Sequence, residues 1–130
     1  MNAQNYKIPG NRKILLVEDV EMNQFLASKK IESWGVRVDI AQNGRIALEM
    51  VQKEFYDLVL MDLQMPVMTG YETTEKVRAM KEEKYQKLPI IALTASAVIG
   101  ENHKVFRIGM NDYVSKPFNP KDLYEKIHQY

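Results

Sequence analysis

The sequence predicts an α/β fold in which a parallel β-sheet is covered by helices on both faces. Five short apolar stretches recur along the chain, and the segments between them have apolar residues at helical spacing. Three of the stretches, ILLV, DLVLM and PIIAL, are almost continuously apolar, which is typical of strands that are buried on both faces. Regular alternation of strands and helices favours a parallel sheet whose crossover connections are right-handed.

The predicted domain begins after a polar tail. The 130 residues are enough for about one domain. Residues 1–11 are mostly polar and end in the breaker cluster Pro9-Gly10-Asn11, so we expect a tail or linker remnant there and one domain over 12–130. The predicted strands cover residues 13–17, 36–41, 56–61, 88–93 and 111–115.

The first three helices are predicted from apolar positions that lie three or four residues apart. The first covers residues 21–34 and ends before Gly35, because glycine is common just after the end of a helix. The second follows Asn43, whose side chain suits the position that caps a helix. The third contains Tyr71 and Val77 and is followed by a polar loop, KEEKYQK.

Two further helices are expected in the last third of the chain. Ala97 and Val105 mark a weaker helix that contains Gly100, and glycine inside a helix is less favourable than alanine by about 1 kcal/mol. The last helix begins at Asn119-Pro120, because asparagine is a favourable cap and proline is tolerated at the first helical position. We therefore expect the helix around Gly100 to be the least rigid.

Composition excludes several functional classes. The chain has 18 basic and 17 acidic side chains, which gives no overall charge for binding nucleic acid or a membrane surface. It has no cysteine, which excludes thiolate zinc sites, iron–sulfur clusters and a cysteine nucleophile. No apolar run is long enough to span a bilayer, and the first residues lack the apolar stretch of a signal peptide. We expect a soluble, cytoplasmic protein without direct contact with nucleic acid or membrane.

Polar side chains gather where the predicted strands end. These residues are Glu18 and Asp19 after the first strand, Asp62 at the third, Thr94 at the fourth and Lys116 at the fifth. The carboxyl ends of parallel strands share one edge of a sheet, and ligands bind outside that edge. The sequence therefore predicts a site that combines three carboxylates, a hydroxyl and an ammonium.

Three neighbouring carboxylates indicate a divalent cation. They repel one another, and a hard cation with oxygen ligands, such as Mg²⁺, removes that repulsion. Asp62 is then either a third metal ligand or a nucleophile that accepts a phosphoryl group. Lys116 and Thr94 would pair with phosphoryl oxygens. The alternatives are structural, with Glu18 and Asp19 capping the following helix. Lys116 would then form a plain salt bridge, and Thr94 would be only a strand residue.

Two absences narrow the chemistry further. The sequence has no GxGxxG or GxxxxGK[ST] motif, which weakens the case for nucleotide-binding folds of those types. Gln64 stands two residues after Asp62, where an aspartate-nucleophile phosphohydrolase usually has a second aspartate as acid and base. We therefore expect slow turnover at Asp62.

Four sequence blocks resemble the receiver domain of two-component response regulators. They are LLVED at 15–19, DLVLMDLQMPVMTGYE at 57–72, PIIALTA at 89–95 and GMNDYVSKPF at 109–118, in the order and spacing of that family. The resemblance covers about residues 12–130, and it implies a flavodoxin-like five-stranded parallel sheet of order 2-1-3-4-5. Some of the blocks also resemble receivers that are attached to hybrid histidine kinases.

The resemblance implies a phosphoacceptor and a metal site. Asp62 would accept a phosphoryl group from a phosphohistidine. Asp19 and Asp62 would bind Mg²⁺ directly, with Mn²⁺ as an alternative ion. Glu18, at a position where many members have aspartate, would act through water, and the backbone carbonyl of Gln64 would complete the protein ligands. The peptide bond that precedes Pro117 is expected to be cis.

The same resemblance implies a switch around the phosphoryl group. Lys116 would contact this group, and the Thr94 hydroxyl would move toward it. The backbone N–H groups of Leu63 and Ala95 would help to hold its oxygens. Tyr113 would turn inward with this change, so that phosphorylation biases a two-state element.

The sequence therefore predicts a phosphorylation-dependent signalling switch whose partner is a histidine kinase or a histidine-phosphotransfer protein. Two other functions stay open at this point: a Mg²⁺-dependent phosphohydrolase that uses Asp62 as its nucleophile, and an inert interaction module. Stand-alone catalysis is not expected. One domain uses nearly the whole chain, so we expect the output to reside on another protein or in the rest of a longer one.

Overall fold

Five parallel strands form a sheet in the computed structural model, which describes residues 6–95 and 99–130. The strands are β1 (Lys13–Val17), β2 (Arg37–Ala41), β3 (Leu58–Asp62), β4 (Ile90–Thr94) and β5 (Asp112–Ser115). Their spatial order is β2-β1-β3-β4-β5, and each neighbouring pair is parallel. The predicted fold class and strand order are confirmed.

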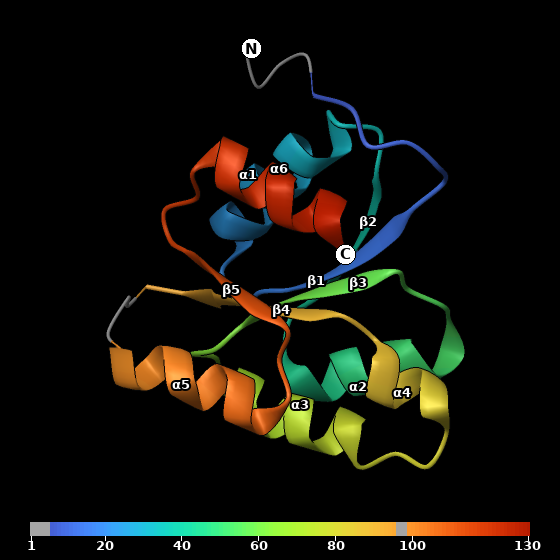
Figure 1. The fold of residues 1–130 in the computed structure, drawn as a ribbon, viewed down its shortest axis with the longest axis vertical. Helices are drawn as coiled ribbons and strands as arrows, with labels where there is room; N and C mark the ends of the chain where they lie inside the picture. The colour runs from blue at the N-terminus through green and yellow to red at the C-terminus, as the bar shows by residue number, and fades with distance from the viewer. Residues whose placement is uncertain (1–5, 96–98) are drawn as a thin grey trace.

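Helices cover both faces of this sheet. They are α1 (Glu21–Glu32), α2 (Gly44–Lys53), α3 (Gly70–Arg78), α4 (Glu83–Lys87), α5 (Ile99–Ile108) and α6 (Pro120–Gln129). Helices α1 and α6 lie on one face of the sheet, and α2 to α5 lie on the other (Figure 1). Within the described residues, no helix combines the length and the apolar character needed to cross a membrane.

Alternate residues of the strands fill two separate cores. Leu15 and Val17 of β1 belong to the core between the sheet and helices α2 to α5, whereas Ile14 and Leu16 belong to the core shared with α1 and α6. This alternation follows from the pleat of a strand, in which successive side chains point to opposite faces. Burial on both faces explains why the strands read as continuous apolar runs in the sequence.

The strand register brings the carboxyl ends of the strands to one edge of the sheet. Asp62 of β3 is level with Leu93 of β4, and Thr94 of β4 is level with Ser115 of β5. Because all pairs are parallel, the loops that follow β1, β3, β4 and β5 leave the sheet from this same edge.

Several helices begin at side chains that cap them. Asn43 Oδ1 accepts a hydrogen bond from the N–H of Ile46 at 2.9 Å at the start of α2. Thr69 and Glu72 form a capping box at the start of α3. The side chain of Asn119 accepts hydrogen bonds from the first turn of α6. The helix starts predicted at Asn43 and Asn119 are confirmed.

Some boundaries differ from those predicted. Part of the segment KEEKYQK forms the short helix α4 rather than a loop, because Tyr85 is buried against the core and its carbonyl accepts a hydrogen bond from Arg78 at 2.7 Å. A single apolar anchor gives no helical period to recognise. Strands β3 and β4 begin two residues later than predicted, at Leu58 and Ile90. The weaker helix is α5, and Ala97 lies outside the described residues.

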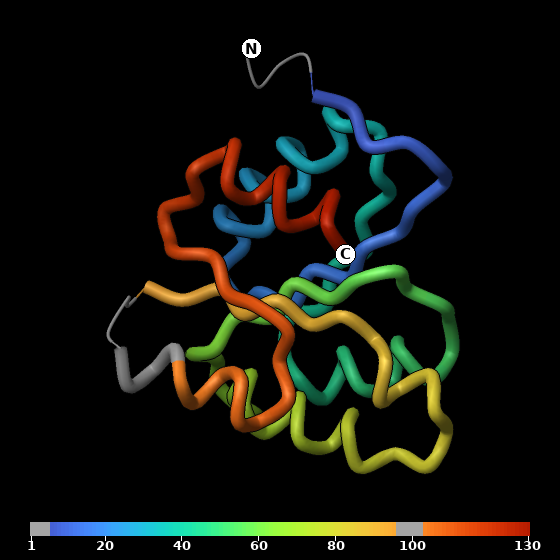
Figure 2. Tube along the Cα trace, viewed as in Figure 1, coloured from blue at the N-terminus to red at the C-terminus, as the bar shows by residue number. Residues whose placement is uncertain are grey.

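Residues 6–8 pack against the domain, a contact that the division into 1–11 and 12–130 does not anticipate. The chain passes the loop between α1 and β2 before it enters β1 (Figure 2). Ile8 is 4% exposed, and its N–H donates to the carbonyl of Trp34 at 2.9 Å. Tyr6 stacks on Tyr124 of α6 with ring centroids 4.3 Å apart. This segment therefore adds to the core shared with α1 and α6.

Candidate functional site

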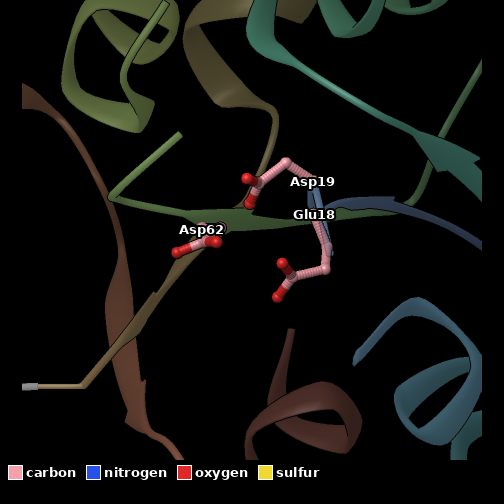
Figure 3. A group of neighbouring side chains, drawn as sticks. All are labelled: Glu18, Asp19 and Asp62. Atoms are coloured by element: carbon pink, nitrogen blue, oxygen red, sulfur yellow. The ribbon is translucent and has the colours of Figure 1, made fainter. Parts of the chain in front are cut away.

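The predicted site residues lie together at the carboxyl edge of the sheet. Asp62 ends β3, Thr94 ends β4, and Glu18 and Asp19 directly follow β1. Lys116 follows β5, and its N–H donates to the carbonyl of Thr94 at 2.8 Å. Figure 3 shows Glu18, Asp19 and Asp62 with their carboxylates turned toward a shared space. The parallel order of the strands thus brings residues from distant parts of the chain to one place.

Three carboxylates form a group that fits a divalent cation. One oxygen atom from each of Glu18, Asp19 and Asp62 lies within 4.8 Å of the other two. Glu18 and Asp62 are buried, with exposed fractions of 1% and 6%. Oxygen atoms in such a group suit Mg²⁺, which binds carboxylates together with water and phosphate oxygens. The residues present therefore fit the metal that the sequence predicts.

Lys116 lies between two of these carboxylates. Its Nζ donates to Glu18 Oε1 at 2.7 Å and lies 3.2 Å from Asp62 Oδ2. The peptide bond between Lys116 and Pro117 is cis, as predicted. The ammonium therefore links the ends of β1, β3 and β5 and offsets part of the repulsion between the two acids.

Burial and neighbouring charges shift the pKa values of these groups. Burial, reinforced by the negative charge of Glu18, raises the pKa of Asp62 to about 6, although Lys116 opposes the shift. Burial also acts to raise the pKa of Glu18, but hydrogen bonds from Lys116 and from the Val20 N–H outweigh it and lower that pKa. Burial acts to lower the pKa of Lys116, but its contacts with the two acids outweigh this and raise it. Of the two buried acids, Asp62 is therefore the one at which protons compete more strongly with a cation.

The remaining predicted residues flank Asp62 and the end of β4. The N–H of Gln64 donates to Asp62 Oδ1 at 3.3 Å, and the Gln64 side chain is exposed. The N–H of Leu63 donates to the carbonyl of Leu93 at 3.2 Å, so in this structure it belongs to the sheet. Ala95 directly follows β4 and is exposed. Their roles toward a phosphoryl group stay predictions.

Tyr113 of β5 lies between side chains of two flanking helices. Its ring meets Phe106 of α5 edge-on, with centroids 6.2 Å apart. Lys126 of α6 places its Nζ 4.8 Å from the Tyr113 ring centroid, and it also donates to the Tyr113 carbonyl at 2.6 Å and to Asp112 Oδ1 at 3.0 Å. No sequence pattern singles out Lys126, because a lysine near the end of a helix is ordinary.

An apolar surface next to the site was not predicted. The exposed large apolar side chains in this part of the chain are Val20, Met22, Phe25 and Leu26. Beside them, a groove of about 310 Å³ is lined by residues that include Leu26 and Lys30 of α1, Lys116, and Leu123 of α6. The sequence does contain an indication of this surface. Met22, Phe25 and Leu26 of α1 lie off the stripe of apolar residues that packs against the sheet.

Comparison with known proteins identifies the family. A model described as the response regulator receiver domain matches residues 14–128. Hybrid signal transduction histidine kinase I of Dictyostelium discoideum is 39% identical over 122 residues, which cover 90% of this chain. The chain spans only 7% of the length of that kinase.

Solved structures that share the fold include a receiver domain with magnesium and a receiver domain in complex with a phosphotransfer protein. The receiver domain of sensor histidine kinase PA1611 from Pseudomonas aeruginosa PAO1, with a magnesium ion coordinated in its active-site cleft, is 39% identical with a TM-score of 0.81, and the match covers 92% of this chain and 96% of that one. The complex of the Saccharomyces cerevisiae histidine phosphotransfer protein Ypd1 with the receiver domain of Ssk1 matches at 29% identity and a TM-score of 0.85, covering 95% of this chain and 91% of that one. Together with the family match, these findings show that the chain belongs to the response regulator receiver domain family of two-component signalling.

Proposed function

We propose that this domain accepts a phosphoryl group on Asp62 from a phosphohistidine of a partner protein and then changes conformation to control an output. The observation that carries the proposal is the setting of Asp62. Its carboxylate ends β3, is nearly buried, and lies beside Lys116 and the acidic pair Glu18 and Asp19. Membership in the receiver family supports the same role.

The transfer is a substitution at phosphorus. An oxygen of the ionised Asp62 carboxylate attacks the phosphorus atom, the bond from phosphorus to the imidazole nitrogen breaks, and its electron pair stays on the imidazole. The product on this chain is an aspartyl phosphate. During transfer, negative charge builds up on the phosphoryl oxygens. Lys116 can pair with one of these oxygens, because its Nζ already lies 3.2 Å from Asp62 Oδ2.

Asp19 and Asp62 are the proposed direct ligands of Mg²⁺, or of Mn²⁺, with the backbone carbonyl of Gln64 as a third protein ligand and Glu18 acting through water. Asp19 is available for this role because its carboxylate makes no hydrogen bond or ion pair with any residue that the structure describes. When bound, the cation would neutralise charge on the oxygens of the phosphoryl group during transfer.

The proposed switch is a response to new charge. Phosphorylation adds a charge of about −1.5 to −2 and three strong acceptor oxygens. Lys116, the Thr94 hydroxyl and the N–H groups of Leu63 and Ala95 would serve these oxygens. For Leu63 this requires its N–H to leave the Leu93 carbonyl that it contacts here. Tyr113 would turn inward with Thr94 and alter the surface formed by α5, β5 and α6.

The proposed partner is a histidine kinase or a histidine-phosphotransfer protein that docks helices on α1. Helix α1 begins two residues after Asp19, so its exposed apolar residues Met22 and Phe25 lie close to the site along the chain. An exposed apolar face of this kind suits contact with an amphipathic helix. The Ssk1 receiver, which shares this fold, was solved with the phosphotransfer protein Ypd1, and this supports the choice of partner.

We also propose that the domain works in the cytoplasm and makes no direct contact with nucleic acid or membrane, because its basic and acidic side chains are nearly balanced. The receiver domain is proposed to occupy residues 12–130. Residues 6–8 pack on it as an added segment.

Chemical phosphorylation tests the proposed acceptor. With acetyl phosphate and Mg²⁺, the intact mass of the wild type should rise by one phosphoryl group, and EDTA should prevent the change. Asp62→Asn should remain unlabelled, because its amide is a poor nucleophile. Asp122→Asn, which changes an aspartate of α6 outside the site, should be labelled like the wild type. Equal labelling of Asp62→Asn and the wild type would contradict the proposal.

Docking on α1 predicts a separate result. Phe25→Ala should slow transfer from a phosphorylated histidine-phosphotransfer protein by about tenfold or more, as expected for an aromatic anchor of an interface. It should leave labelling by acetyl phosphate unchanged. The matched control is Phe55→Ala, which removes an even more exposed ring near the end of α2. Equal slowing by both substitutions, or by neither, would exclude α1 as the docking face.

A further inference from the structure

The side chain of Glu18 is fixed at both of its oxygen atoms. Oε1 accepts a hydrogen bond from Lys116 Nζ at 2.7 Å, and Oε2 accepts one from the N–H of Val20 at 3.0 Å. Its backbone is also fixed, because its N–H donates to the Ala41 carbonyl at 3.1 Å and its carbonyl accepts from Gln24 Nε2 at 2.7 Å. Glu18 is therefore a buried acceptor with a single well-defined position.

The two adjacent acids are not equivalent. Within the described part of the chain, the Asp19 carboxylate makes no hydrogen bond or ion pair, whereas both oxygens of Glu18 have partners. A cation can therefore use Asp19 oxygens without breaking a protein contact. The same cation would reach Glu18 only in competition with Lys116 or the Val20 N–H.

Lys116 makes its shorter contact with Glu18 rather than with Asp62, at 2.7 Å against 3.2 Å. A lysine ammonium is a point charge on a flexible stem, so it needs a fixed acceptor to keep one position. We infer that Glu18 is a positioning residue that holds the Lys116 ammonium beside Asp62, ready to pair with the oxygens of the incoming phosphoryl group. This inference rests on the proposed function of Asp62 and gives Glu18 a role beyond that of a water-mediated metal ligand.

The length of the Glu18 side chain is part of the inference. An aspartate at this position is one carbon shorter, so from the same backbone, while it accepts from the Val20 N–H, its other oxygen would lie farther from Lys116. The ammonium would then lose its nearer acceptor and be held less firmly beside Asp62. Glu18 therefore keeps Lys116 close to Asp62 while sharing its charge.

A double-mutant cycle at saturating Mg²⁺ separates positioning from metal binding. The rate of labelling by acetyl phosphate is measured for Glu18→Ala, Lys116→Met and the double variant, after calorimetry has given the Mg²⁺ concentration that saturates each protein. Glu18→Ala should lower the rate by about tenfold in the wild-type background but by about twofold or less beside Lys116→Met, because the two residues act as one unit. Glu21→Ala, which removes an exposed charge from the first residue of α1, should change little.

A second measurement requires neither bound metal nor phosphoryl transfer. In the metal-free protein, NMR measures how fast the Lys116 ammonium protons exchange with solvent. Exchange should be at least about tenfold faster in Glu18→Ala and in Glu18→Asp than in the wild type, because the fixed acceptor is lost or lies farther away. Glu18→Gln keeps the side-chain length and one acceptor oxygen, so its Lys116 protons should exchange more slowly than those of Glu18→Ala or Glu18→Asp. It replaces Glu18→Ala in the comparison if that variant does not fold.

Several outcomes would overturn the inference. A Glu18→Ala rate that returns to the wild-type value when Mg²⁺ is raised would make Glu18 a metal-binding residue only. Rate losses from Glu18→Ala and Lys116→Met that multiply would show that the two side chains act independently. If the wild type is labelled normally, either of these results overturns only the inference about Glu18. If the wild type takes no label, the proposed function of Asp62 is overturned as well.

Discussion

At Asp62 the fold holds a carboxylate whose ionised form is disfavoured by burial. Burial raises the pKa of Asp62 from an ordinary 3.8 to about 6. The protonated form of Asp62 is therefore favoured in the folded protein. Its contribution to the free energy of unfolding is complete below the ordinary pKa of 3.8 and is lost as the pH rises through about 6. In the metal-free protein at neutral pH, Asp62 therefore destabilises the fold, which is a common property of functional residues.

Asp62→Asn should accordingly stabilise the metal-free protein. The free energy of unfolding at pH 7 should rise by about 1–3 kcal/mol, and the gain should shrink toward pH 4, where the wild-type carboxyl is protonated in the fold. Lys116 keeps Glu18 as its partner in this variant. Urea unfolding in EDTA at both pH values measures the effect, with Asp122→Asn as the control. A variant less stable than the wild type at pH 7 would exclude this explanation.

Among the elements, α6 depends on contacts with the segment before β1. Tyr124 of α6 donates to the Lys7 carbonyl at 2.9 Å and meets Trp34 edge-on with centroids 5.4 Å apart. Arg12 donates to the carbonyl of Ile127 at 2.8 Å. The same helix provides Lys126, which lies over the ring of Tyr113. The segment therefore helps to hold a helix that borders the proposed switch.

Ile8→Ala tests whether this segment contributes to stability. Ile8 is buried among residues of the core shared with α1 and α6, so its truncation should lower the free energy of unfolding by about 2 kcal/mol. Lys7→Ala is the matched control, because the Lys7 side chain is exposed and should matter little. Urea unfolding compares the two variants. Equal stability of both would mean that the segment does not pack in solution as it does here.

For the whole molecule, the arrangement of the strands could be predicted because few folds accommodate apolar strands that alternate with amphipathic helices along the chain. Apolar runs such as 14–17 are typical of strands in the centre of a sheet with helices on both faces, and here they fill both cores. A parallel sheet then requires Glu18, Asp62, Thr94 and Lys116 to meet at one edge. The site was therefore predictable to the level of which residues meet.

Other features depend on contacts that no local pattern encodes. Helix α4 forms because Tyr85 finds a place in the core, and residues 6–8 are ordered by Trp34 and Tyr124, which lie far away in the sequence. Val67 adopts a φ of 73°, which a β-branched residue rarely does, so the residue type does not predict this backbone conformation. The preference of Lys116 for Glu18 over Asp62 depends on side-chain reach in three dimensions.

Transfer from a phosphorylated histidine-phosphotransfer protein tests the central claim most directly. A radiolabelled donor is mixed with the wild type and with Asp62→Asn in the presence of Mg²⁺, and the label on each protein and in free phosphate is followed with time. We predict that the label moves to the wild type, to at most one group per chain, and that mass spectrometry places it on Asp62, while Asp62→Asn leaves it on the donor. Rapid, repeated release of free phosphate would instead indicate a phosphohydrolase, and label that stays on the donor with the wild type would contradict the receiver function proposed for Asp62.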